Sequence, residues 1–213
     1  MTISQATKFL EDAFDALNKE YFENALARPI ITIQTSPRAY GHFTSREVWQ
    51  DAQRKKAYHE INLGAERLDR PIANTIATLV HEMVHYYCQV NGIQDTSRGG
   101  TYHNKRFKEE AEKRGLLIDY DQKIGFSITQ PSPALKRFCT AQKWRNKLTI
   151  CRSGEFGGND PKPKKPSSTR KYVCPCCGQS VRATKDVNIL CMDCSQQMQV
   201  ASLKVHFKSS AVR

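Results

Sequence analysis

The segment Val80-His81-Glu82-Met83-Val84-His85-Tyr86 decides the fold of this chain. It carries an HExxH pattern inside a long stretch of helical periodicity. On a helix, positions i and i+4 project from one face, so His81 and His85 can reach the same metal ion. Glu82 points to the side, where it can hold a water molecule instead of binding the metal. The pattern therefore predicts a helix that carries two zinc ligands and a general base.

The residues around the motif distinguish it from a chance match on an ordinary helix. Between Pro71 and Gln94, Glu82 is the only charged side chain, whereas a solvent-facing helix of that length normally carries several. An apolar stripe at helical spacing predicts the face that packs on the core; it comprises Ile72, Ile76, Leu79, Val80, Met83, Val84 and Tyr87. Unpaired buried charge is costly, so two His and a Glu in this setting need strong partners. A metal ion with a bound water would supply them.

The composition is that of a soluble protein with one sizeable core and a small additional module. The chain has 213 residues, 39% of them hydrophobic, and a mean hydropathy of −0.61. No apolar run reaches the roughly 18 residues that span a bilayer, and the first residues lack the features of a signal peptide. We therefore expect a cytoplasmic monomer without membrane contact, or a nuclear one in a eukaryote. In a reducing compartment, the eight Cys favour metal ligands and buried thiols over disulfides.

The net charge of +12 is concentrated in the C-terminal part of the chain. Residues 1–135 carry 17 basic and 17 acidic side chains, so this part is neutral. Residues 136–171 carry 11 basic against 2 acidic side chains, and residues 173–213 carry 5 against 2. A concentrated cationic segment is typical of a protein that binds a polyanion, most often nucleic acid. A solubilising linker would have the same composition, and charge alone leaves both interpretations open.

The remaining patterns predict a mixed α+β domain around the motif helix. Residues 2–26 have the periodicity of an amphipathic helix with a capping box. Residues 30–35, 40–44 and 57–63 are rich in β-branched and aromatic side chains, which indicates three strands in a small antiparallel sheet. Pro71 and Asn91-Gly92 mark the ends of the motif helix. A His on a strand is usually a hydrogen-bonded structural residue, so His42 and His59 are left out of the ligand set.

The third ligand of the expected zinc site has to lie after the motif helix. A catalytic zinc commonly takes three protein ligands. His103 lies at the start of a second helix expected over residues 101–114, and it would complete a three-His set. Glu109 or Glu110 would instead give a site with two His and one carboxylate. Their neighbours look like an ordinary solvated helix face, which favours His103 without excluding the carboxylates.

At this point the chain resembles the SprT-like zinc metallopeptidases, the group that includes the Spartan DNA-protein crosslink proteases. The resemblance rests on a helix, a few strands, the HExxH helix, and then His103 followed four positions later by Phe107; it covers roughly residues 4–117. It implies a zincin-like minimal metalloprotease fold with a catalytic zinc. It also implies that the substrates are proteins attached to DNA, and the domain is expected over residues 1–130.

A second metal site is predicted near the C-terminus. Cys174, Cys177, Cys191 and Cys194 form two CxxC pairs separated by 13 residues. Four thiolates at this spacing are typical of a closed, structural zinc site, so we expect a small zinc ribbon over residues 173–197 that unfolds without zinc. Cys176 could replace a neighbour, but the two-residue spacing favours Cys174 and Cys177. The remaining three, Cys88, Cys139 and Cys151, have no partner pattern and are interpreted as plain thiols.

Basic segments flank the expected ribbon, a Pro-containing linker over residues 131–172 and a tail over residues 198–213. The linker includes a flexible second half from 154 to 169. Its first half carries Phe138 and Trp144 among Lys and Arg. These rings could stack on unpaired bases, or they could dock the segment on the preceding domain.

Together, these patterns favour a zinc-dependent endopeptidase with a DNA-binding C-terminal half. In this interpretation His81, His85 and His103 bind a catalytic Zn²⁺, Glu82 is the general base, and a second, structural Zn²⁺ is held by the ribbon. The alternative is a non-enzymatic DNA-binding or regulatory protein in which the HExxH zinc is structural. A structural site has no need of Glu82, so the complete motif favours the enzyme.

Overall fold

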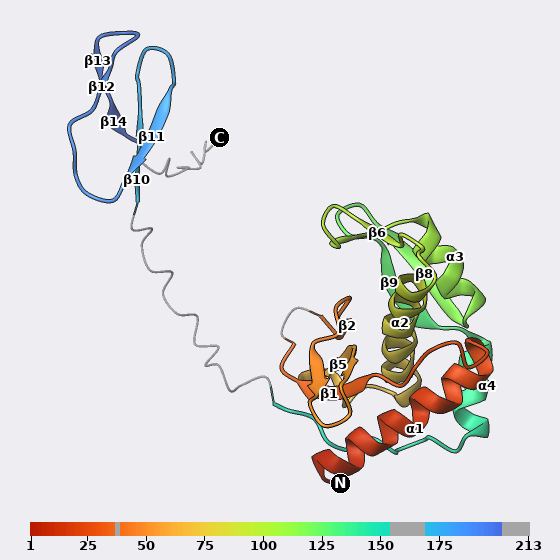
Figure 1. The fold of residues 1–213 in the computed structure, drawn as a ribbon. Helices are drawn as coiled ribbons and strands as arrows, with labels where there is room; N and C mark the ends of the chain where they lie inside the picture. Colours follow the sequence, from red (N-terminus) through yellow and green to blue (C-terminus); the bar gives the residue numbers. More distant parts are fainter. Residues whose placement is uncertain (37–38, 154–168, 202–213) are drawn as a thin grey trace, which may run out of the picture. The chain divides into compact units, whose positions relative to one another are not determined.

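The computed structural model describes residues 1–36, 39–153 and 169–201, which form two compact units (Figure 1). The expected flexible segment at residues 154–169 and the expected basic tail at residues 198–213 lie mostly outside the described residues. Among the described helices, none is both long and apolar enough to cross a membrane. Each unit is described by itself.

The first unit combines helices with small sheets, as the sequence predicts. Its helices are α1 (Ile3–Tyr21), α2 (Ile72–Val90), α3 (Lys105–Lys113), α4 (Pro133–Ala141) and the 3₁₀ helix η1 (Ala65–Arg67). Its strands are β1 (Ile30–Gln34), β2 (Gly41–Phe43), β3 (Trp49–Asp51), β4 (Lys56–Tyr58), β5 (Glu60–Gly64), β6 (Thr96–Ser97), β7 (Tyr102–His103), β8 (Leu116–Asp121) and β9 (Gly125–Pro131). The fold class is therefore mixed α+β.

Helix α1 forms through the predicted capping box and ends earlier than predicted. The Thr2 hydroxyl accepts a hydrogen bond from Gln5 N, and the Gln5 side chain accepts one from Thr2 N. After Tyr21 the backbone turns through two residues in the left-handed region, Glu23 and Asn24. The helix thus stops at Tyr21 instead of continuing to residue 26, because a helix cannot pass through this conformation.

The sheet next to α1 is mixed, whereas the sequence analysis expected an antiparallel one. Its strand order is β1-β5-β2, with β5 antiparallel to β2 and parallel to β1. The predicted strand over residues 57–63 is divided: its first part joins β3 in a hairpin as β4, and its second part is the central strand β5. In the sequence, β2 and this hairpin come between β1 and β5. The chain reverses direction in β2 and reverses again before β5, so β1 and β5 run in the same direction.

Helix α2 occupies the centre of the first unit. Figure 1 shows it between the β1-β5-β2 sheet and the group formed by α3, β8 and β9. It begins after Pro71 and ends at Asn91, as predicted. The apolar stripe packs into the main hydrophobic core, where Ile76, Leu79, Val80, Met83 and Val84 are fully buried. This packing on several sides agrees with the lack of charged residues other than Glu82.

A second sheet, of order β6-β7-β9-β8, follows α2 in the chain. The expected helix over residues 101–114 is shorter, because β7 takes up Tyr102 and His103 and the helix begins only at Lys105. The side chain of Asn104 accepts hydrogen bonds from Arg106 N and Phe107 N, which caps α3. His103 is therefore on a strand and not on a helix.

The packing of the first unit extends beyond residue 130, where the sequence analysis ended the domain. Helix α4 and the turn after it lie against α1, and Leu135, Cys139 and Trp144 are buried in the main core. The Trp144 ring meets the rings of Phe9 and Phe138 edge-on, with centroids 5.9 and 5.5 Å apart. Of the two alternatives for Trp144 and Phe138, docking on the preceding domain is the one that the structure supports.

The second unit is a small all-β module. Its strands are β10 (Arg170–Val173), β11 (Ser180–Ala183), β12 (Leu190–Cys191), β13 (Gln196–Gln197) and β14 (Gln199–Val200). They form a three-stranded sheet of order β11-β10-β14 and the pair β12-β13. The buried cluster contains only Tyr172, Cys174, Cys191 and Met198. A core this small does not hold a fold together without additional links.

Candidate metal centres

Three histidine side chains converge at one point in the first unit. His81 and His85 lie one turn apart on α2, and His103 reaches them from β7. The Nε2 atom of His81 is 3.2 Å from Nε2 of His85 and 3.2 Å from Nε2 of His103, and the third pair is 3.1 Å apart. The structure thus brings together the three ligands that the sequence analysis favoured.

The spacing of these nitrogens fits a zinc ion. Tetrahedral zinc with Zn–N bonds of about 2.0–2.1 Å places two ligand nitrogens about 3.3 Å apart. On the far side of the rings, His81 Nδ1 is 2.7 Å from Thr129 Oγ1 and His85 Nδ1 is 2.5 Å from Asp95 Oδ2. If Nδ1 donates the proton in both bonds, the Nε2 lone pairs of these two rings point at the cluster centre. Lone pairs that face one another at this distance repel unless a cation lies between them.

Burial favours the neutral form of two of these histidines, His81 and His103. It lowers the pKa of His81 well below the usual value, and the neighbouring His85 and His103 lower it further. It also lowers the pKa of His103 to about 4, with His85 as the next cause. Zinc binds imidazole in its neutral form, so both shifts suit a metal ligand.

The aromatic ring of Phe107 packs against all three imidazoles. Its ring centroid lies 4.6 Å from that of His81 and 4.7 Å from those of His85 and His103. Phe107 projects from the first turn of α3, which the Asn104 cap places directly after His103. The pair of residues on which the family resemblance rested, His103 and Phe107, is therefore in direct contact.

Backbone pairing between β7 and β9 positions His103. The His103 N–H donates to the Ile124 carbonyl at 3.0 Å, and His103 lies opposite Gly125 in the parallel pair. Gly125 has a φ of +74°, and a Cβ atom at this position would lie 2.1 Å from the His103 carbonyl oxygen. Only glycine permits this approach. The Nδ1 atom of His103 is buried and has no hydrogen-bond partner among the described residues.

Glu82 lies beside the histidine cluster and is not a member of it. The residue is 5% exposed, and burial raises its pKa to about 7, against smaller lowering effects from His85 and from the backbone N–H of Phe43 on β2. Gly41, also on β2, leaves space for the carboxylate, because a Cβ there would come within 3.2 Å of Glu82 Oε1. At this pKa the carboxyl group can both accept and release a proton near neutral pH.

The two glutamates considered as alternative third ligands lie away from the cluster. Glu109 is exposed on α3. Glu110 forms ion pairs with Lys113 at 2.7 Å and Arg114 at 2.6 Å. Neither belongs to a group of potential metal ligands among the described residues. The arrangement is therefore three His with an adjacent carboxylate.

The two histidines that were left out of the ligand set, His42 on β2 and His59 between β4 and β5, also lie outside the cluster. His59 Nδ1 is 3.0 Å from the Thr44 carbonyl oxygen, and its ring packs on Tyr86 with centroids 4.9 Å apart. His42 is exposed on β2. His59 thus has the hydrogen-bonded structural role expected for it.

A known protein family matches the part of the chain that contains this site. Residues 10–122, slightly more than half of the chain, match the SprT-like family. The chain belongs to the SprT-like family. Comparisons with curated proteins and with solved structures gave no significant match. The region that matches the SprT-like family contains Glu82 and all three clustered histidines and ends before Thr129.

The sequence analysis missed three residues that support this SprT-like site, namely Asp95, Gly125 and Thr129. No spacing rule connects them with HExxH, since they reach the site through the loop after α2 and through β9. Asp95 carries one usable signal, because it is an acidic residue shortly after a ligand helix and metal-bound His often pairs with a carboxylate.

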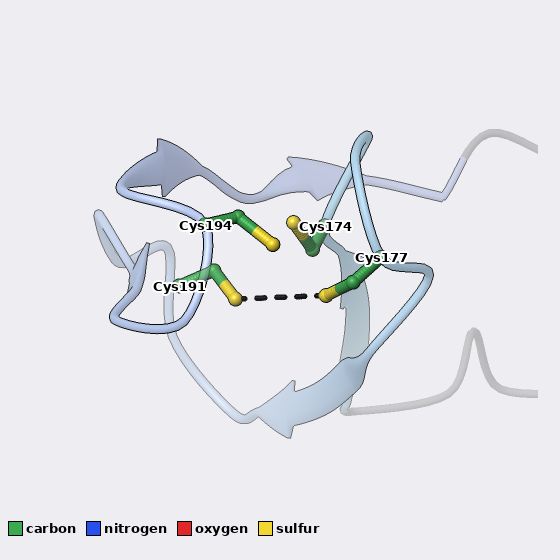
Figure 2. Close-up of side chains that lie close together, drawn as sticks. All are labelled: Cys174, Cys177, Cys191 and Cys194. Carbon is green, nitrogen blue, oxygen red and sulfur yellow. Dashed lines mark hydrogen bonds between the residues drawn. The ribbon is translucent and has the colours of Figure 1, made fainter.

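The second candidate centre is the cysteine cluster of the small unit (Figure 2). Figure 2 shows the four sulfur atoms of Cys174, Cys177, Cys191 and Cys194 directed toward one another, and they lie within 4.8 Å. The Sγ atoms of Cys177 and Cys191 are 3.7 Å apart, close to the roughly 3.8 Å expected from Zn–S bonds of about 2.3 Å. Cys176 is exposed and lies outside the cluster. The four thiols therefore fit a tetrahedral ion.

Backbone hydrogen bonds prepare one of these thiols for metal binding. They come from Cys177 and, more weakly, from Cys176, and they lower the pKa of Cys174 to about 7 even though burial acts in the opposite direction. The thiolate is the form that binds zinc. The turn that contains the first pair is closed by a bond from Gly178 N to the Cys174 carbonyl.

Proposed function

We propose that this protein is a zinc-dependent endopeptidase. The observation that carries the proposal is the buried Glu82 next to three histidine nitrogens that converge at zinc-ligand spacing. A purely structural metal site has no use for this carboxylate, and an isolated buried charge is costly. A zinc ion on His81, His85 and His103 would supply a Lewis acid that polarises a peptide carbonyl and makes a bound water more acidic.

Glu82 performs the proton transfers in this proposal. Its carboxylate takes a proton from the attacking water and later gives it to the leaving amine. Because the pKa of the group is about 7, both directions of transfer are accessible near neutral pH. Gly41 and the Phe43 N–H keep the carboxylate in place between β2 and the histidines.

The edge of β2 without a strand partner is a suitable place for the substrate backbone. Within the described residues, β2 is an edge strand of its sheet. Backbone hydrogen bonds join it to β5 at Tyr40 and Thr44, so the backbone groups of Gly41 and Phe43 point away from β5. An extended peptide can pair with such an edge, which would bring a peptide bond next to Glu82.

DNA-bound proteins are the proposed substrates. The support is the resemblance to Spartan-type proteases together with the cationic C-terminal half. In the described part of that half, Lys136, Arg137, Lys143, Arg145 and Lys147 are all exposed, whereas Cys139 and Trp144 between them are buried. This arrangement gives a cationic surface on α4 and the turn after it. The ribbon is proposed to add a second DNA contact.

The test of the catalytic proposal is the Glu82→Gln protein. The substitution keeps the size of the side chain and removes the base, so zinc content should stay at two per chain while cleavage of a DNA-bound protein falls by at least about 100-fold. Glu109→Gln makes the same chemical change on an exposed surface and should leave cleavage unaffected. Metal analysis and a cleavage time course measure both outcomes. Equal cleavage by Glu82→Gln and wild type would refute the mechanism.

A further inference from the structure

The hairpin of β3 and β4 is a basic and aromatic projection that the proposed function does not use. Residues 51–56, which contain its turn, carry three cations, Arg54, Lys55 and Lys56, against one acid, Asp51. All three cations are exposed. Although the domain as a whole is neutral, this hairpin presents a local positive charge.

The single acid of the turn is engaged locally. Asp51 Oδ1 accepts hydrogen bonds from Gln53 N and Arg54 N, both at 3.0 Å, and Oδ2 lies 3.5 Å from the Arg54 guanidinium. Lys55 and Lys56 have no carboxylate partner in the described part of the chain. The two ammonium groups are therefore available to an external anion.

Two aromatic rings accompany these cations. Trp49 and Tyr58 are opposite each other in the antiparallel pair, so both side chains lie on one face of the hairpin. The Trp49 Nε1–H donates to Glu60 Oε2 at 3.1 Å, which fixes the indole while 42% of the residue stays exposed. Lys56 Nζ lies 5.0 Å from the centroid of the Tyr58 ring. The result is a fixed, accessible aromatic surface next to exposed cationic side chains.

We propose that the β3-β4 hairpin binds single-stranded DNA, with a base stacked on Trp49 and backbone phosphates at Lys55 and Lys56. Aromatic rings with neighbouring cations are the elements by which proteins bind unpaired strands, because a free base can stack on a ring and its phosphate attracts the charge. Bases in a duplex are already stacked on one another and cannot do this. A protein partner fits less well, since the cores of protein interfaces are depleted of lysine. The proposal rests on the proposed function in taking DNA as the partner, and it adds a contact on the metalloprotease domain itself.

The two tryptophans of the chain make the proposal testable in the intact protein. Trp49 is the exposed one and Trp144 is 8% exposed in the core. Titration of the full chain with oligothymidylate at low salt should quench tryptophan emission to saturation, while fluorescence anisotropy of labelled DNA measures total binding. In Trp49→Phe the remaining emission comes from Trp144 and should not respond. Duplex DNA of equal length should quench much less.

Charge variants test the phosphate contacts. Lys55→Gln with Lys56→Gln should shift the quenching midpoint to about 5- to 20-fold higher DNA concentration at low salt. Lys19→Gln with Lys123→Gln removes the same charge from exposed sites elsewhere in the unit and should leave the midpoint unchanged. DNA binding by anisotropy without quenching, or equal midpoints for the two double variants, would overturn the hairpin site alone. Absence of any DNA binding would overturn the DNA partner as well, whereas loss of cleavage in Glu82→Gln tests the peptidase separately.

Discussion

Two of the three clustered imidazoles are held by a hydrogen bond at Nδ1, and the third is placed by the backbone pairing of its strand. Asp95 holds His85, Thr129 holds His81, and the backbone at Gly125 holds the strand that carries His103. Contacts of this kind set the orientation of a ring and the nitrogen that faces the metal. The geometry of the site is therefore determined as much by these three neighbours as by the ligands.

At the scale of single residues, we predict that Asp95→Ala weakens zinc binding. Removal of the carboxylate frees the His85 ring and takes away a negative charge near the metal, so zinc affinity of the histidine site should fall about 10- to 100-fold. The thermal unfolding of the first unit in the presence of excess zinc should change little, because Asp95 does not belong to the hydrophobic core. Competition with a chromophoric chelator measures the affinity.

Asp119→Ala is the matched control for this substitution, since Asp119 is an exposed acid on β8. It should bind zinc as the wild type does. If Asp95→Ala and Asp119→Ala release zinc at the same chelator concentration, Asp95 has no role in metal binding.

At the scale of elements, the sequence predicts best what depends on local pattern. The limits of α2, the cap of α1 and the cysteine spacing of the ribbon are all properties of neighbouring residues. The mixed strand order and the place of His103 on β7 depend on pairing between distant segments, and a strand of two residues has no periodicity to detect. Asn104 was a missed local signal, because Asn is a strong helix cap and would have placed the start of α3 after His103.

At the scale of elements, we predict that the fold of the ribbon depends on its bound zinc. Cys177→Ser should remove its zinc and unfold residues 170–200, because the buried cluster of this unit has only four residues. Cys176→Ser, one position earlier and exposed, should retain both zinc and fold. Backbone NMR spectra should show random-coil shifts for the ribbon of Cys177→Ser and unchanged shifts for α2. A folded ribbon in Cys177→Ser would mean that a metal ion on the four thiols is not needed to stabilise its fold.

At the scale of the whole molecule, the positive charge is divided between the units. The sequence alone assigns the charge excess to a C-terminal half separate from the domain with the histidines. The structure instead places residues 133–152 on the first unit, with Trp144 buried and the neighbouring Lys and Arg exposed. The candidate catalytic domain therefore has a cationic surface of its own.

The cationic surface on α4 and the turn after it predicts how DNA binding depends on salt. Replacing the five exposed cations of that surface by Gln should reduce the slope of log affinity against log salt by about 0.7–0.9 for each DNA phosphate that the variant no longer neutralises; the five are Lys136, Arg137, Lys143, Arg145 and Lys147. A control with the same charge change uses other exposed cations of the first unit, namely Lys8, Lys19, Lys105, Arg106 and Lys123. Binding isotherms at several salt concentrations measure both slopes. Equal slopes in the two variants would exclude the α4 surface from DNA binding.

The pairing of His103 with Gly125 and of His81 with Thr129 has a consequence for biosynthesis. A nascent chain that has emerged only as far as β8 already contains all three histidines and Glu82, yet it lacks the strand that aligns two of the rings. The histidine cluster is thus expected to form late in synthesis, after β9 has left the ribosome and docked. A chain truncated before residue 125 would carry the whole HExxH motif without the contacts that orient His81 and position His103.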